Sequence, residues 1–183
     1  MSTYPGRSFR RNTALPLLAL SMILLAGCAT VVKSGTFRSR YYGYSVALPA
    51  GWSGTKAQDQ WGSGSSFPGF EDPDIDLFSG PSSVRAFAVG QTWPGSLAAY
   101  IRMTLQAQAA AHQCPVAASS NQPITISGSP ARLLGMSCQG LQLEIAITVH
   151  ARNGLVFTCD LASATGADRA AVRRLLAGIR LKP

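Results

Sequence analysis

The chain has little charge and no long apolar segment, and both deficits exclude classes of protein. Only 13% of its 183 residues are charged, and lysine and arginine form no run beyond a pair and are not interleaved with aromatic residues. Nucleic-acid binding needs a concentrated basic face, so it is not expected. The apolar run over 14–26 is about 13 residues long, whereas a helix needs about 20 to cross a bilayer core of roughly 30 Å. A transmembrane helix is therefore not predicted.

Histidine is also scarce, which limits catalytic and metal chemistry. The two histidines are His112 and His150. His112 and Cys114 are spaced as possible metal ligands, and His150 could be a third. A metal site is not expected, because His150 lies on a distant predicted strand and a disulfide at Cys114 would compete for the thiol. Cys159 precedes Asp160, yet it alternates with apolar residues and is expected in the core, where a thiol is not reactive. With no nucleophile elbow and no phosphate-cradling glycine loop, we predict no enzyme, no cofactor and no catalytic residues.

The first 28 residues have the three parts of a secretion signal. Arg7, Arg10 and Arg11 form a basic start, the apolar run follows, and small residues precede Cys28. Leu25-Ala26-Gly27-Cys28 resembles the lipobox of bacterial lipoproteins. The resemblance implies that residues 1–27 are removed as a signal peptide and that Cys28 carries fatty-acyl chains such as palmitate. An ordinary cleaved signal with a coincidental cysteine is the alternative.

The same resemblance predicts where the protein resides. Two or three acyl chains hold a protein stably on a membrane. Ala29 stands where an aspartate would indicate retention in the inner membrane, so we expect the outer membrane, facing the periplasm, in a bacterium with two membranes. The Arg10-Arg11 pair lacks the bulky apolar pair of a twin-arginine signal, so we expect the general export route.

The chain after the signal fits one domain of ordinary size. We assign residues 28–36 to a lipidated tether and residues 37–183 to a single domain. Loss of the three signal arginines lowers the formal net charge from +8 to +5. This excess is spread thinly from Lys33 to Lys182, and we interpret it as a contribution to solubility. Attraction to anionic lipid headgroups is expected to add little beside covalent acyl chains.

Three cysteines remain beside the lipid site, so at most one internal disulfide can form. The compartment outside the inner membrane is oxidising and permits one. Cys159 is expected in the core, where a thiol behaves as a small hydrophobe. Cys114 follows a predicted helix and Cys138 ends a predicted strand, and a bridge at element ends does not distort a core. We therefore predict a Cys114–Cys138 disulfide.

Apolar periodicity predicts a sheet-rich domain with two main helices. Alternation with a period of two predicts strands over 44–48, 75–78, 84–92, 123–127, 131–138, 141–149 and 155–161. Asn153-Gly154 predicts a two-residue hairpin turn. Residues 53–70 are interpreted as an irregular loop or a weak strand pair. The order of elements favours an α+β fold.

Capping residues place the two helices. Ser96 is the predicted N-cap of a helix that reaches about Ala111, with an apolar stripe of Leu97, Tyr100, Ile101 and Leu105. Thr165 and Asp168 form a predicted capping box for the final helix. The apolar stripe predicted for that helix consists of Val172, Leu175, Leu176 and Ile179.

The sequence YGYSVALPAGW resembles the opening of the PsbP-like superfamily, in which an aromatic strand runs into a turn such as Pro49-Ala50-Gly51-Trp52. A central helix, a hairpin at Gly128, a meander and a final helix ending in Ile179-Arg180 are similar in order. The resemblance covers about 37–181 and implies an antiparallel sheet meander packed with two main helices, an α/β/α sandwich. It implies mostly non-enzymatic roles, as assembly factors, binding adaptors or small lipoproteins, and it carries no catalytic residues.

Loop residues supply the candidate binding sites. The candidate partner surface consists of Trp61, Phe67, Phe70 and Trp93, because exposed aromatic side chains in glycine-rich loops form partner surfaces. The alternative is that these rings fold back and cap the sheet edge.

Asp72, Asp74 and Asp76 have the alternate spacing that begins a calcium loop. Leu77 stands where that loop needs glycine and Ser83 where it needs glutamate, so the three are only weak metal candidates. The resulting hypothesis is a membrane-anchored, non-catalytic envelope lipoprotein that binds a protein partner as an adaptor or assembly factor. The alternative hypothesis is a lipoprotein that binds a small ligand or a cation through the 61–78 loop.

Overall fold

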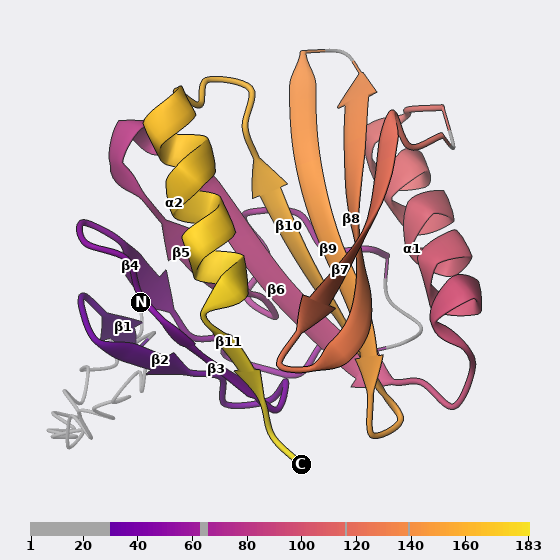
Figure 1. Cartoon of the computed structure of the whole chain (residues 1–183), viewed down its shortest axis with the longest axis horizontal. Coiled ribbons are helices and arrows are strands. Elements are labelled where there is room, and N and C mark those ends of the chain that lie inside the picture. The colour runs from indigo at the N-terminus through magenta and orange to yellow at the C-terminus, as the bar shows by residue number, and fades with distance from the viewer. Residues whose placement is uncertain (1–29, 63–65, 116, 139) are drawn as a thin grey trace, which may run out of the picture.

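The computed structural model describes residues 30–62, 66–115, 117–138 and 140–183 (Figure 1). The predicted signal peptide, with the lipobox and Cys28, lies outside these residues. Within the described part of the chain, no helix has the length and apolar character that a membrane crossing requires.

The centre of the molecule is a sheet of eight antiparallel strands. Its order is β1-β4-β5-β6-β10-β9-β8-β7. The strands are β1 (Val31–Val32), β4 (Ser53–Thr55), β5 (Asp76–Ser79), β6 (Arg85–Thr92), β10 (Asn153–Asp160), β9 (Leu141–His150), β8 (Ser129–Cys138) and β7 (Ser120–Ile126). The apolar residues on both faces of the 84–92 segment predict a central strand, and β6 lies between β5 and β10, as expected.

A second sheet of three antiparallel strands joins the two ends of the described chain. β3 (Tyr44–Ala47) lies between β2 (Thr36–Arg38) and β11 (Ile179–Leu181). In the register, Phe37 and Ile179 both pair with Val46, and these three side chains are buried. The next row consists of Arg38, Ser45 and Arg180 and points the other way, since successive residues of a strand alternate faces.

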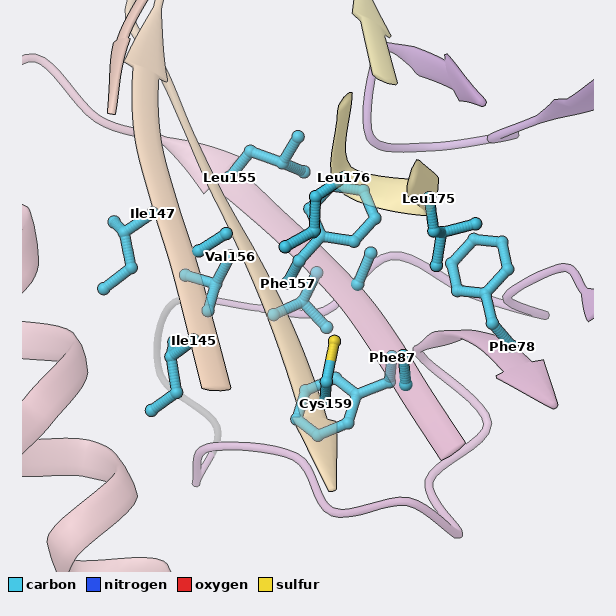
Figure 2. Packing of buried hydrophobic residues seen from close by; sticks show 14 of the residues in the cluster. Phe78, Phe87, Ile145, Ile147, Leu155, Val156, Phe157, Cys159, Leu175 and Leu176 are labelled. Atoms are coloured by element: carbon cyan, nitrogen blue, oxygen red, sulfur yellow. The ribbon is translucent and has the colours of Figure 1, made fainter. Parts of the chain in front are cut away.

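Two helices cover opposite faces of the large sheet. α1 (Leu97–His112) packs against β9 and β10, and α2 (Gly166–Ala177) lies beside β3 in the same layer as the small sheet. Figure 2 shows Ile145 and Ile147 on one side of the strands and Phe157, Leu175 and Leu176 on the other. A short 3-10 helix, η1 (Pro81–Ser83), connects β5 to β6. The α+β fold with two main helices is therefore confirmed.

Aromatic side chains fill the space between the two sheets. The rings of Tyr44 and Phe157 meet edge to face with centroids 4.9 Å apart, and Phe37 and Phe78 have the same separation and a similar arrangement. All four are fully buried, as is almost all of Trp52. Burial of such large apolar surfaces is the main force that holds the small sheet onto the large one.

The β9–β10 turn differs from the prediction. Ala151 and Arg152 form the two-residue turn, with φ values of 47° and 64°, while Asn153 already pairs with His150. Gly154 lies inside β10, where a Cβ atom would overlap the ring of Tyr100. The Asn-Gly preference for turns is overridden here because packing of α1 on the sheet requires glycine at position 154.

The structure also differs from the prediction at the boundaries of two segments. Gly178 ends α2, so Ile179 lies on β11 and pairs with Val46, and it does not continue the helical stripe. Part of the segment predicted as a tether forms strands, because Val31 and Val32 pair with β4 and Thr36 begins β2. Backbone pairing with distant strands, which local patterns do not reveal, fixes both segments.

Candidate functional site

A cleft of about 310 Å³ lies on the α1 side of the large sheet. It opens between α1, the end of β6 and the loop that follows residue 60. Its apolar lining consists of Trp61, Phe67, Trp93, Pro94, Met103 and Ala107. Three of the four predicted partner-surface residues, Trp61, Phe67 and Trp93, therefore line the cleft together with two residues of α1.

The loop aromatics are held against the sheet by Phe87, a fully buried residue of β6. Phe70 meets Phe87 edge to face at 4.9 Å, and Phe67 lies 6.1 Å from it. Trp61 packs edge to face on Phe67 at 5.7 Å. Because Trp61 is only 6% exposed and Phe67 only 7%, the prediction that these two form an exposed surface is wrong. They fold back onto the sheet and form the wall of the cleft.

Phe70 and Trp93 stay half-buried. Trp93 follows β6, stacks at 5.0 Å on Tyr100, and donates a hydrogen bond of 3.1 Å from its indole Nε1 to the carbonyl of Ser96. Gly95 lies against the same indole, where a Cβ would come within 2.9 Å of Nε1. The ring is thus fixed at the start of α1 with one edge open to the cleft.

An arginine fixes the rest of the loop. The Arg85 guanidinium donates to a Glu71 carboxylate oxygen at 2.7 Å and to the Phe70 carbonyl at 2.8 Å, and it lies over the Phe70 ring at 5.2 Å. Glu71 is largely exposed, so the ion pair itself contributes little free energy. Its effect is to hold one conformation of the loop.

The face of α1 against the sheet is polar, which the sequence pattern did not predict. Tyr100, Thr104 and Gln108 follow each other at intervals of four residues and are fully buried. The Gln108 amide donates a hydrogen bond of 2.9 Å to the Thr158 hydroxyl. Thr104 Oγ1 and Gln108 Oε1 have no hydrogen-bond partner among the described residues. Such groups oppose docking of the helix, since each has lost its hydration.

Apolar residues of α1 are displaced to its flanks as a result. Leu97, Ile101 and Leu105 were predicted as its core stripe together with Tyr100, but only Tyr100 is buried. Met103, on the opposite flank, borders the cleft and is also half-buried. The helix therefore presents apolar surface on both sides of its contact with the sheet.

The three aspartates predicted as weak metal candidates do not converge. Asp76 is fully buried and accepts hydrogen bonds from Tyr44 Oη at 2.9 Å and from the Ala57 amide at 3.0 Å. Asp72 accepts from the Gly69 amide at 2.6 Å, and Asp74 contributes only its carbonyl, to the Tyr42 hydroxyl. Among the described residues there is no group of three side chains suited to a metal ion. The Asp72 carboxylate is engaged within the loop, and the Asp76 carboxylate is engaged between the two sheets.

A second pocket of about 250 Å³ lies at the same end of β6, where Gln91 and Thr92 border both it and the cleft. Tyr41, Tyr42, Thr148, His150, Asn153 and Lys182 contribute to its lining. His150 Nδ1 lies 2.8 Å from the Ser129 hydroxyl, which fixes the ring. His112 and Cys159 are not part of this pocket, so the residues considered for thiol or metal chemistry are not brought together.

The cysteines differ in state. Cys159 is a free thiol, fully buried on β10 as predicted, and burial raises the pKa of the Cys159 thiol well above its usual range. Figure 2 shows its sulfur among apolar side chains. Cys114 lies just after α1 and is half-buried. Cys138 ends β8, but its side chain lies outside the described part of the structure, so the Cys114–Cys138 pair stays a prediction.

Comparison with known proteins adds a likeness of fold. No family model matches the sequence, and no curated protein matches it either. The cyanobacterial PsbP (CyanoP) from Synechocystis sp. PCC 6803 is similar in structure, with a TM-score of 0.52 and 12% identity over 88% of this chain and 98% of that chain. A protein from Bacteroides thetaiotaomicron reaches a TM-score of 0.48 and 11% identity over 83% of this chain and 50% of that chain. The chain therefore has a PsbP-like fold, and at this identity the likeness extends to the fold alone.

Proposed function

We propose that the protein is a non-catalytic lipoprotein, anchored through Cys28, that binds another envelope protein through the cleft beside α1. The anchor is supported by the lipobox, since its four residues follow a basic and then an apolar segment. The location that we propose is the outer membrane, facing the periplasm, in a bacterium with two membranes. In this role the protein is an adaptor or assembly factor.

The observation that carries the partner-binding proposal is the composition of the cleft. Trp93 and Met103 are half-buried and border the cleft, whose wall is formed by the buried Trp61 and Phe67. Aromatic residues and methionine are enriched at the centres of protein interfaces. Methionine adapts its shape to a partner side chain because its chain is unbranched and flexible. Trp93 is held by Tyr100 and Ser96, so a partner meets a pre-formed surface.

We also propose the Cys114–Cys138 disulfide. It is supported by Cys114, which is a disulfide-bonded cysteine, and by Cys159, whose free and buried thiol leaves it out of the pairing. A bridge between these positions would fasten the end of α1 to the end of β8. It would stabilise the fold by roughly 3–4 kcal/mol in the chain-entropy account. This matters because the polar face of α1 contributes little to its docking.

A small apolar ligand is the second candidate for the same site. The cleft has about 310 Å³, which is near the lower end of ligand pockets. In this version of the alternative hypothesis, the ligand binds the apolar residues at the start of the 61–78 loop. A cation is not favoured, since Asp76 is already engaged by Tyr44 and Ala57.

The test is capture of the partner from crosslinked envelopes with the cleft blocked. Ala107→Arg places a long cationic side chain in the cleft, and Ala110→Arg places the same side chain at an exposed position of the same helix. We expect Ala107→Arg to lose a stoichiometric partner that the wild type and Ala110→Arg retain. A Cys28→Ala form measures how far capture depends on the anchor. Equal capture by both arginine variants would contradict the cleft as the binding site.

A further inference from the structure

The outer surface of the layer formed by α2 and the small sheet is basic. Arg38 on β2, Arg173 and Arg174 on α2, and Arg180 on β11 are all exposed. Asp168 is the one carboxylate within α2 and the three strands of the small sheet. It is almost fully buried and is engaged by Thr165 in the capping box. These elements therefore present positive charge without a neighbouring negative charge of their own.

The strand register aligns two of these arginines. Arg38 and Arg180 both pair with Ser45, so they flank it in one row across β3. Since neighbouring strands lie about 4.8 Å apart, the two Cα atoms are separated by roughly 10 Å on the same outward face. The Arg180 guanidinium also donates to the Ala177 carbonyl at 3.1 Å, which holds it at the junction of β11 and α2. The sheet arginines and the helix arginines thus form one basic face, consisting of Arg38, Arg173, Arg174 and Arg180.

Two acidic residues lie on the opposite side of the large sheet. Glu71 and Asp72 belong to the loop that borders the cleft, and Phe70 of this loop packs on Phe87. Phe87 pairs with Thr158, whose hydroxyl accepts the hydrogen bond from Gln108 of α1. The loop and α1 therefore share one face of the large sheet, and α2 and the small sheet share the other.

The described chain begins at the edge of the basic layer. Figure 1 shows β1, which begins at Val31, beside β2. The Thr30 carbonyl accepts a hydrogen bond of 3.1 Å from the Lys56 amide, which fixes this point two residues after Cys28. Val31 is 52% exposed and is the one exposed large hydrophobic residue of the described part of the chain. A lipid anchor at Cys28 would therefore hold this edge within a few residues of the membrane.

We propose that the basic face docks on anionic phospholipid headgroups. The anchoring part of this inference rests on the proposed lipidation, whereas the basic face does not. Attraction to a membrane surface falls off within a Debye length of about 8–10 Å, so it acts on a face that a short anchor keeps close. Docking in this way orients the protein with α2 and the small sheet toward the membrane. The acidic loop, α1 and the cleft then face away, toward a partner.

The experiment measures binding of the full-length, unlipidated Cys28→Ala chain to vesicles by co-sedimentation. Vesicles of mixed phosphatidylglycerol and phosphatidylcholine are compared with vesicles of phosphatidylcholine alone. The ratio of the two partition coefficients removes the contribution of the apolar segment, and comparison of this ratio between variants removes the shared contribution of Arg7, Arg10 and Arg11. Because the chain carries no acyl group, the result does not depend on lipidation. Acyl labelling of the wild type at Cys28 tests the anchor separately.

The test variant is Arg38→Glu/Arg173→Glu, and the matched control is Arg102→Glu/Arg152→Glu. The side chains of Arg38 and Arg173 make no hydrogen bond or ion pair with other described residues, so their substitution leaves the described side-chain hydrogen bonds and ion pairs intact. Arg102 lies on α1 and Arg152 in the β9–β10 turn, off the basic face, and the change of charge is the same.

We expect the test variant to lower the ratio at least about tenfold, since each basic residue near such a surface contributes about fivefold. The control variant should lower it by less than about threefold. Arg38→Gln/Arg173→Gln, which removes charge without reversing it, should show a smaller loss in the same direction. An equal loss in test and control would overturn the basic face in favour of a diffuse net-charge effect, and no loss in the test variant would overturn it outright.

Discussion

The hydroxyl of Tyr44 donates a hydrogen bond of 2.9 Å to a carboxylate oxygen of Asp76, and both side chains are fully buried between the two sheets. Tyr44 lies on β3 of the small sheet, and Asp76 begins β5 of the large one. The Ala57 amide binds the other carboxylate oxygen at 3.0 Å. This polar contact fixes the position of the small sheet, which apolar packing alone would leave less specific.

Tyr44→Phe should lower the free energy of unfolding by about 2 kcal/mol, because Asp76 would lose a partner while staying buried. Urea denaturation measures the change. Tyr41→Phe removes a phenolic hydroxyl that donates to the Gln58 carbonyl at an exposed site, and it should cost no more than about 0.5 kcal/mol. Equal costs for the two variants would show that burial of the Tyr44–Asp76 pair adds nothing.

The stability of the fold should decrease with rising pH through the titration of Asp76. Burial raises the pKa of Asp76 above its ordinary value of 3.8, so the folded state binds the proton more tightly than the unfolded state. The free energy of unfolding contributed by this group is therefore highest below pH 3.8 and decreases as pH rises through the raised pKa. Asp76→Asn removes the titration and should remove that part of the slope. Other carboxylates contribute their own slopes, so the difference between wild type and variant is the quantity to measure. A variant with the same pH profile as the wild type would contradict the assignment.

Gly154→Ala should lower the free energy of unfolding by about 1–3 kcal/mol, the usual cost of overpacking. The added methyl group would overlap the ring of Tyr100, which is itself fully buried. Gly166→Ala, at the start of α2, is the control, since a Cβ there meets nothing within 4 Å. Thermal unfolding of both variants checks the result, and an unchanged Gly154→Ala would mean that α1 can move away at little cost.

Thr104→Val should raise the free energy of unfolding by about 1 kcal/mol, although it alters a fully buried side chain. The Thr104 hydroxyl has no hydrogen-bond partner among the described residues, and valine has the same shape without the lost hydration. Both residues are β-branched, so helix propensity changes little. A destabilised variant in urea would mean that the hydroxyl makes a contact that matters.

Strands and helix caps could be predicted from the sequence where neighbouring residues alone determine them. The alternation over 141–149 matches β9, and the Thr165–Asp168 capping box opens α2. β11 was missed because Ile179 continues the helical spacing of Leu175 and Leu176, while its pairing with Val46 joins distant parts of the chain. A three-residue strand has too few positions to show a period of its own.

The candidate site was predicted less well than the fold. The aromatic residues of the cleft were recognised by type, but their burial was not, because Phe87 belongs to a strand distant in sequence from the loop. The contribution of Met103 and Ala107 was missed because the predicted stripe of α1 followed Leu97, Ile101 and Leu105. The spacing of Tyr100, Thr104 and Gln108 was the available signal, yet a polar stripe is not expected to face a sheet.

The central claim is that an anchored protein binds a partner with its α1 cleft while its α2 face lies on the membrane. Site-specific photo-crosslinking in intact envelopes tests it directly, with the photoreactive residue at Met103 in the cleft or at Ala170 on the exposed side of α2. The account predicts a discrete protein adduct from position 103 and lipid adducts from position 170. A protein adduct from position 170, with none from position 103, would contradict it.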